Sequence, residues 1–126
     1  MLDKFYRLLI ERKPKRIGFS FESLDMYNSI SGNSQHALLC ILRTIKYRCD
    51  LDAIKIDFGY DQSIYGNRVN YSRCKEDLLS RRFIIEYNGN HYVNPFMINY
   101  FSRRQLEYFS GYFNVKKSTK ANFGLK

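Results

Sequence analysis

Side chains that suit nucleic-acid recognition are concentrated between residues 67 and 76 of this 126-residue chain. Arg68 and Asn70 are the residue types that form paired hydrogen bonds with guanine and with adenine, respectively. Ser72 and Arg73 suit phosphate oxygens, which accept hydrogen bonds from hydroxyl and guanidinium groups. Asn67 is a preferred N-cap residue, and a helix beginning there would turn partial positive charge toward a phosphate. The stretch predicts either a DNA-reading helix or, as the alternative, an ordinary solvated helix face.

The apolar residues of the same stretch have helical spacing. Tyr71, Cys74, Leu78 and Leu79 recur at i, i+3, i+7 and i+8, which predicts an amphipathic helix over residues 67–82. Residues 83–87 predict a strand, the Asn-Gly pair at 88–89 predicts a tight turn, and residues 91–93 predict a returning strand. A winged helix-turn-helix ends in this way, with its recognition helix followed by its wing.

The segments before residue 67 supply the other elements of such a domain. Residues 34–48 predict the central core helix, capped by Asn33 or Ser34. Residues 53–58 alternate apolar and polar side chains, which predicts a strand. Residues 59–66 are the expected first helix of the helix-turn-helix, with Gly66 supplying the turn. The apolar stripe of the core helix consists of Ala37, Leu38, Ile41, Leu42 and Ile45.

The two ends of the chain are expected to add helices to this domain. A stripe of Leu2, Phe5, Leu8 and Leu9 predicts a helix over residues 1–12, which Pro14 ends. Residues 17–21 predict a short strand, residues 21–30 and 102–113 predict helices, and residues 114–126 predict a loose basic tail. The predicted class is α+β, mostly helical. It comprises an N-terminal helix and basic arm (1–16), a winged helix-turn-helix domain (17–101), and a C-terminal helix and basic tail (102–126).

The basic residues are distributed unevenly. The net charge is +9, from 21 basic and 12 acidic side chains. Residues 67–126 carry eleven basic and four acidic side chains, whereas residues 18–66 carry four basic and six acidic ones. A basic excess on the half that holds the predicted recognition helix is typical of a polyanion binder. General solubility is the competing explanation, since a net charge of this size also provides it.

Other classes of protein find little support. Three cysteines without a C-x-x-C spacing argue against a disulfide framework or a zinc site and favour a reducing cytoplasm. No signal peptide and no apolar run of membrane-spanning length is recognisable, so no membrane partner is expected. His36 and His91 are single and far apart, and no phosphate-binding or nucleophile motif is present. We therefore expect neither an enzyme nor a cofactor.

Three stretches carry a family resemblance. They are residues 19–42 (FSFESLDMYNSI, then NSQHALLCIL), residues 71–84 (YSRCKEDLLSRRFI) and residues 91–96 (HYVNPF, with a Y-x-[VI]-N-P exit from the wing), and together they span about residues 19 to 101, most of the chain. They resemble the RepL-type plasmid replication proteins of Gram-positive bacteria, within the MarR-like winged-helix group. The resemblance implies sequence-specific DNA binding in replication initiation or its control. It also implies that Arg68, Asn70, Ser72 and Arg73 enter the major groove, while Asn88 and Asn90 touch the minor groove or backbone.

Two residues depart from the family pattern. Lys75 stands where an apolar residue is usual, and we interpret it as a further phosphate contact. Arg82 stands where such helices usually place glycine, because the residue after the helix often needs a left-handed backbone. A different exit from the helix is therefore expected. The predicted DNA-contacting residues are Asn67, Arg68, Asn70, Ser72, Arg73, Lys75, Asn88 and Asn90.

Two hypotheses of function follow. The first is a double-stranded DNA-binding protein in plasmid or phage replication, with a MarR-like transcription regulator as its variant. The second is a winged-helix module that binds protein through an aromatic surface of Tyr100, Phe101, Tyr108 and Tyr112. A second copy of the chain, packed through the helix at residues 1–12, and a protein of the replication machinery are the further partners considered.

Overall fold

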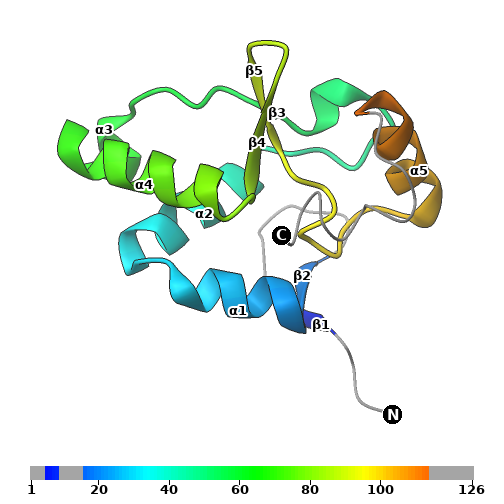
Figure 1. Cartoon of the computed structure of the whole chain (residues 1–126), viewed down its shortest axis with the longest axis horizontal. Coiled ribbons are helices and arrows are strands. Elements are labelled where there is room, and N and C mark those ends of the chain that lie inside the picture. Colours follow the sequence, from blue (N-terminus) through cyan, green and yellow to red (C-terminus); the bar gives the residue numbers. More distant parts are fainter. Residues whose placement is uncertain (1–4, 9–15, 114–126) are drawn as a thin grey trace.

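The computed structural model describes residues 5–8 and 16–113 of the chain. These residues form a mixed α+β structure in which helices predominate (Figure 1). In chain order the elements are β1 (Phe5–Leu8), β2 (Ile17–Ser20), α1 (Phe21–Ser29), α2 (Gly32–Leu42), the 3₁₀ turn η1 (Leu51–Ala53), β3 (Lys55–Ile56), α3 (Gln62–Tyr65), α4 (Arg68–Ser80), β4 (Ile84–Tyr87), β5 (Asn90–Val93) and α5 (Arg103–Tyr112).

The strands form two small antiparallel sheets. In the larger sheet the order is β3-β5-β4, with Lys55 opposite Tyr92 and Ile84 opposite Val93. Figure 1 shows the β4–β5 hairpin standing out from the upper edge of the molecule, with α3 and α4 on one side and α5 on the other. The second sheet pairs β1 with β2, and Gly18 of β2 forms one further bridge to Asn99.

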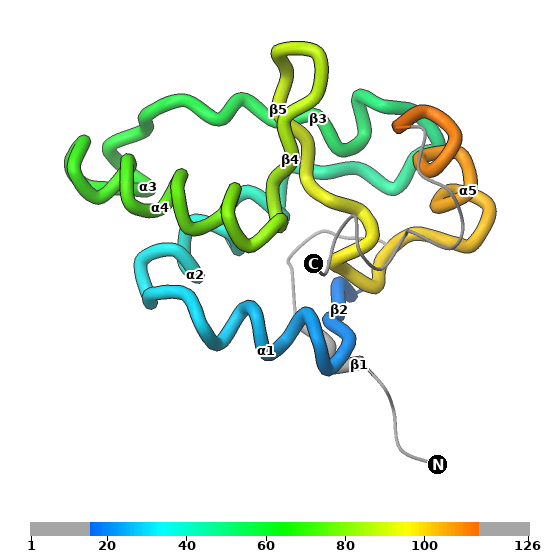
Figure 2. The backbone as a smooth tube through the Cα atoms, in the orientation of Figure 1, coloured from blue at the N-terminus to red at the C-terminus, as the bar shows by residue number. Residues whose placement is uncertain are grey.

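A single hydrophobic core connects the helices with both sheets. The Phe19 and Phe83 rings lie with their centroids 5.9 Å apart, which joins β2 to the segment between α4 and β4. Phe113, just after α5, packs on Tyr92 of β5 at 5.5 Å. The backbone trace in Figure 2 shows α1 along one edge of this core and α5 at the end remote from α3. The core therefore includes the C-terminal helix that follows residue 101.

Several predicted elements are confirmed. The turn after β4 contains Asn88 and Gly89 with φ of 52° and 79°, the left-handed values that a two-residue hairpin turn requires. The strand at 17–21 is β2, and the helix at 21–30 is α1, capped by Ser20. The helix at 102–113 is α5, begun by a capping box between Ser102 and Gln105.

Two predicted helices are corrected. The helix over residues 1–12 is wrong where the structure describes it, because residues 5–8 form β1 and pair with β2. The homodimer expected through that helix loses its basis. The core helix is shorter than predicted and begins after a Ser31 cap, not Asn33 or Ser34. It ends at Leu42, where the Thr44 hydroxyl donates to the carbonyl of Ile41 and satisfies an acceptor at the helix end.

The aromatic surface of the protein-binding hypothesis is also corrected. Tyr100 and Phe101 are 0% and 5% exposed, and their rings pack at 5.0 Å in the core. Tyr108 and Tyr112 are exposed on α5, as the hypothesis requires. In the described part of the chain no helix has the length and apolar character needed to cross a membrane.

Candidate nucleic-acid interface

The helix pair α3–α4 is defined by its caps and by one glycine. Asp61 caps α3, which is a single turn, and its carboxylate accepts hydrogen bonds from the Ser63 hydroxyl and the Ser63 amide. These two bonds, the hydroxyl bond first, lower the pKa of Asp61. Gly66 has φ of 82° and no Cβ to oppose that left-handed turn. Asn67 then caps α4 as predicted, because its Oδ1 accepts from the Asn70 amide at 2.8 Å.

The side of α4 that faces away from the core carries a central row of mixed side chains between two basic edges. Cys74 and Leu78 face the core. At 100° per residue the opposite side of the helix carries Val69, Ser72 and Glu76, all exposed. By the same geometry Arg68 and Lys75 lie along one edge of this face and Arg73 along the other. A central row of one apolar, one hydroxyl and one carboxylate side chain is thus bordered by basic residues on both edges. We call this surface the α4 face.

An aromatic platform holds the two basic residues of one edge. The guanidinium carbon of Arg68 lies 4.6 Å from the Tyr60 ring centroid, and the Tyr60 hydroxyl donates to the Gly66 carbonyl at 3.2 Å. Lys75 is half-buried, with Nζ 5.9 Å from the Phe58 ring. Cation–π contacts of this kind orient a basic side chain while leaving its charge available. The apolar environment explains why a long aliphatic stem is accommodated at position 75.

A hydrogen bond fastens the platform to the helix. The Tyr71 hydroxyl donates to the Phe58 carbonyl at 2.6 Å, which joins α4 to the segment after β3. The Tyr71 ring packs at 4.9 Å against Tyr65 of α3. Burial raises the pKa of Tyr65 to about 12, since the ionised phenolate would lose its hydration there. The α4 face is therefore supported from below by contacts of Tyr71 with Tyr65 and Phe58.

Asn70 has a structural role that the sequence did not predict. Its Nδ2 donates to the Tyr65 carbonyl at 2.8 Å, and its Oδ1 accepts from Asn33 Nδ2 at 3.1 Å. The Cys74 thiol lies within 3.9 Å of the same oxygen. The amide expected to face adenine is thus engaged in joining α2, α3 and α4. Asn70 thus joins three helices, and its contact with a base stays a prediction.

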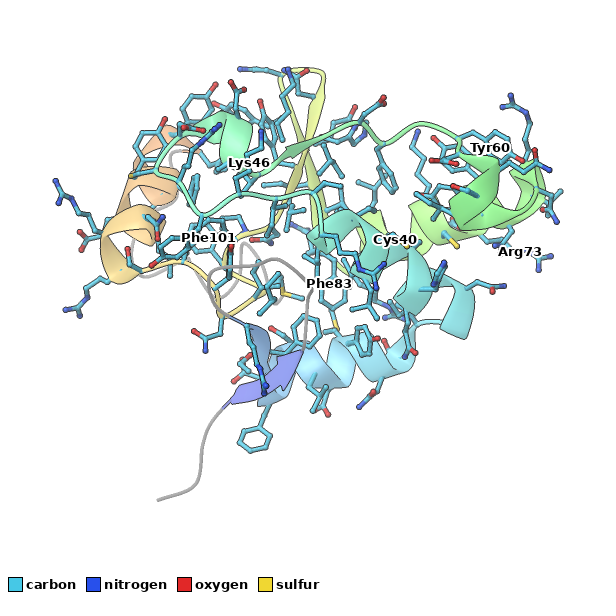
Figure 3. All side chains as sticks on the ribbon, turned by 180° about the vertical axis from the view of Figure 1, so that it is seen from behind. Cys40, Lys46, Tyr60, Arg73, Phe83 and Phe101 are labelled. Atoms are coloured by element: carbon cyan, nitrogen blue, oxygen red, sulfur yellow. The ribbon has the colours of Figure 1, made fainter. Side chains whose placement is uncertain are left out.

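The opposite edge of the α4 face opens into a hollow. Figure 3 shows Arg73 at the outer margin of the molecule, remote from Phe83 in its interior. The hollow beside it lies between α4 and the start of α2. It is lined by Asn33, Tyr65, Asn67, Val69, Asn70 and Arg73. The predicted residues Asn67, Arg68, Ser72 and Arg73 are all exposed on or beside the α4 face.

The exit from α4 positions the hairpin relative to the helix. The Phe83 amide donates to the Leu78 carbonyl and the Arg82 amide to the Leu79 carbonyl, which together form a Schellman motif. Arg82 has φ of 67°, so the expectation of a different exit is wrong: arginine occupies the left-handed position itself. Asn94 is 0% exposed, and its side chain donates to the Arg82 carbonyl at 2.9 Å. Asn94, just after β5, is therefore hydrogen-bonded to Arg82, just after α4.

The hairpin tip carries the other two predicted contacts. Asn88 is exposed at the turn, and Asn90 is half-buried at the start of β5. On the adjoining strand pair, His91 Nε2 lies 4.0 Å from Glu86 Oε2, and the His91 ring packs on Phe58 at 5.4 Å. A shallow groove next to the tip has mixed charge. It is lined by Lys46, Arg48, Asp52, Lys55, Ile56, Asp57, Phe58, Gly89, Asn90 and His91.

Sequence reasoning overlooked three groups of residues near these surfaces. Tyr60 left no periodic signal, although its place six residues before Gly66 lets its hydroxyl reach the glycine carbonyl. Lys46 and Lys55 are exposed near the hairpin tip but come from segments remote from it in sequence. Val69 was overlooked because apolar residues were assigned to the core. Its place between Arg68 and Asn70, off the apolar stripe, was a usable signal.

Among the residues that the structure describes, no three His, Cys, Asp or Glu side chains are grouped closely enough to hold a metal ion. No protein-family model, curated protein or solved structure matches this chain.

Proposed function

We propose that this chain is a winged helix-turn-helix protein that binds double-stranded DNA sequence-specifically, with α4 in the major groove and the β4–β5 hairpin as its wing. The arrangement α2–β3–α3–α4–β4–β5 supports the proposal, with a single-turn α3 followed by a longer, exposed α4. The sheet order β3-β5-β4 supports it as well, because the hairpin is braced by the strand that precedes the helix pair.

The α4 face is the observation that carries this proposal. A major groove is wide enough to admit an α-helix, and its two walls are lines of phosphates. Basic residues on both edges of α4, Arg68 and Lys75 on one and Arg73 on the other, suit these walls. The central residues Ser72 and Glu76 suit base edges, since hydroxyls and carboxylates accept hydrogen bonds from base amino groups. A carboxylate at the centre disfavours a purely phosphate-binding surface.

A role for this binding follows from the resemblance alone. We propose plasmid or phage replication initiation or its control, carried out in the cytoplasm, with a MarR-like regulator of transcription as the alternative. Both roles require the same contact between α4 and a duplex. The location of the preferred sequence, at a replication origin or at a promoter, would separate them.

The test is a DNA titration of the full chain at two salt concentrations. A duplex selected from a random pool and an unrelated duplex are compared with wild-type protein, Arg73→Ala and Arg104→Ala. Arg104 is an exposed arginine of α5, outside the α4 face, and gives the matched loss of charge. We expect Arg73→Ala to weaken binding to both duplexes by a similar factor and to lower the salt slope by about 1, because Arg73 is placed on phosphate, whereas Arg104→Ala should change neither. The logarithm of affinity should fall by about 0.9 per phosphate contacted against the logarithm of salt concentration.

Equal, weak binding to both duplexes would refute the proposal. Equal losses for Arg73→Ala and Arg104→Ala would also refute it, because a general basic surface responds to any lost charge.

Binding of a protein partner is the second candidate function, and two exposed aromatic side chains on α5 favour it. Tyr108 and Tyr112 are 40% and 42% exposed, four residues apart on α5, and the Tyr112 ring packs on Tyr87 of β4 at 5.7 Å. Exposed aromatic residues are enriched at protein–protein interfaces. A protein partner bound at this surface should be lost with Tyr108→Ser, while DNA affinity remains unchanged. Retention of the partner by that variant would remove this candidate.

A further inference from the structure

Val69 is the most exposed large hydrophobic side chain in the described part of the chain, at 65%. It is the second residue of α4 and lies in the central row of the α4 face, three residues before Ser72. Valine has a lower helix propensity than alanine, and burial against its own protein contributes little here. A single exposed apolar residue is common on protein surfaces. Val69, however, lies between the two basic edges of the α4 face, where a bound polyanion would contact it.

The chemistry of the major groove offers one partner for such a side chain. A valine cannot hydrogen-bond to a phosphate, a sugar hydroxyl or a base amino group. The C5 methyl group of thymine is the apolar feature that a standard base pair presents in that groove. The χ1 angle of valine is restricted in a helix, so its two methyl groups are held in a fixed direction. Val69 also lines the hollow that it shares with Asn67 and Arg73.

We propose that Val69 is a specificity-determining residue that selects a thymine by packing on its C5 methyl group. This inference rests on the proposed function, because it requires α4 to lie in the major groove. Asn67 and Arg73 border the same hollow and would hold the backbone while Val69 meets the base. Cytosine, which has no methyl group at C5, would leave Val69 in contact with water.

The experiment removes the methyl group from the DNA and then from the protein. Each thymine of a duplex selected from a random pool is replaced in turn by deoxyuridine, which pairs identically but lacks the C5 methyl. We expect one position to lose affinity by about fourfold, the value of burying one methyl-sized group. With Val69→Ala the same replacement should change affinity by less than twofold. Arg104→Ala, an exposed residue of α5 outside the α4 face, is the control, and the effect of deoxyuridine should persist in it.

Different results would overturn the role of Val69 and the proposed function. If a selected duplex binds tightly but no thymine is sensitive to deoxyuridine, or Val69→Ala retains the sensitivity, the role of Val69 is overturned while the proposed function stands. If no sequence is enriched from the pool, both are overturned. Val69 is exposed, so Val69→Ala is expected to keep the fold, and a midpoint of thermal unfolding no lower than that of the wild type verifies this.

Discussion

Arg82→Gly should stabilise the protein. Arg82 stands at the residue after the α4 C-cap with φ of 67°, a left-handed backbone conformation. Both of its backbone hydrogen bonds, from its amide to Leu79 and to its carbonyl from Asn94, are independent of the side chain. The side chain is exposed. Glycine would therefore keep every bond of the Schellman motif and remove the contact between the arginine Cβ and the backbone.

The magnitude follows from two opposing effects. A non-glycine residue in the left-handed region costs about 1–2 kcal/mol relative to the right-handed one. Glycine also increases the conformational entropy of the unfolded chain, which offsets roughly 0.4–1 kcal/mol of that gain. The net gain in the free energy of unfolding should be about 1 kcal/mol. For a chain of this size, it corresponds to a rise in Tm of roughly 3–6 °C.

Thermal and denaturant unfolding, followed by circular dichroism, would measure this gain with two controls. Arg82→Ala removes the same charge but keeps a Cβ in the left-handed backbone, so it should leave stability nearly unchanged. Arg81→Gly makes the same substitution one residue earlier, where φ is −88°. That variant should lose stability, because a glycine there relieves no strain. If Arg82→Gly proves no more stable than Arg82→Ala, backbone strain at this position is refuted.

Three further predictions concern groups with defined partners. Asn70→Ala should lower the free energy of unfolding by about 1–3 kcal/mol, because the Tyr65 carbonyl loses its amide donor; a loss confined to DNA affinity would contradict the structural role. The pKa of Tyr65 is raised to about 12, so the fold favours the neutral phenol. The contribution of the neutral Tyr65 phenol to the free energy of unfolding should be fully present below about pH 10 and be lost as the pH rises toward 12. In a series of denaturation measurements at alkaline pH, Tyr65→Phe should make this decline less steep. Ser102→Ala should cost about 1 kcal/mol by removing the capping box with Gln105, whereas Ser80→Ala, outside any cap, should cost less in the same denaturant titration.

Elements whose signals are local were predictable from the sequence. The stripe of Cys74 and Leu78 located α4, and the Asn-Gly pair located the hairpin turn, because each depends on neighbours within a few residues. The stripe at residues 1–12 misled for the opposite reason. A strand is stabilised by a partner elsewhere in the chain, and the partner of Phe5 is Ser20. Apolar spacing alone does not report that pairing.

The residue types of the candidate site were predictable from the sequence, but the hydrogen bonds that these residues form were not. The sequence identified Asn70 as a polar residue near the helix start, yet its bond partners come from α2 and α3. The spacing of residues within α4 does not report partners on other helices. Arg82 shows the same dependence: its side-chain type argued for a different exit, but the bonds to Leu79 and from Asn94 fix its backbone.

The pairing of β3 with β5 has a consequence for how the domain opens. Lys55 lies opposite Tyr92, so the chain between them, which contains α3, α4 and β4, is closed into a loop. The entropy of closing such a loop is lost once for the whole segment. The helix pair and the hairpin should consequently form and open as one cooperative unit. We expect the backbone amides of α4 and β5 to exchange with solvent deuterium at similar rates, because the β4–β5 hairpin should open together with the helix.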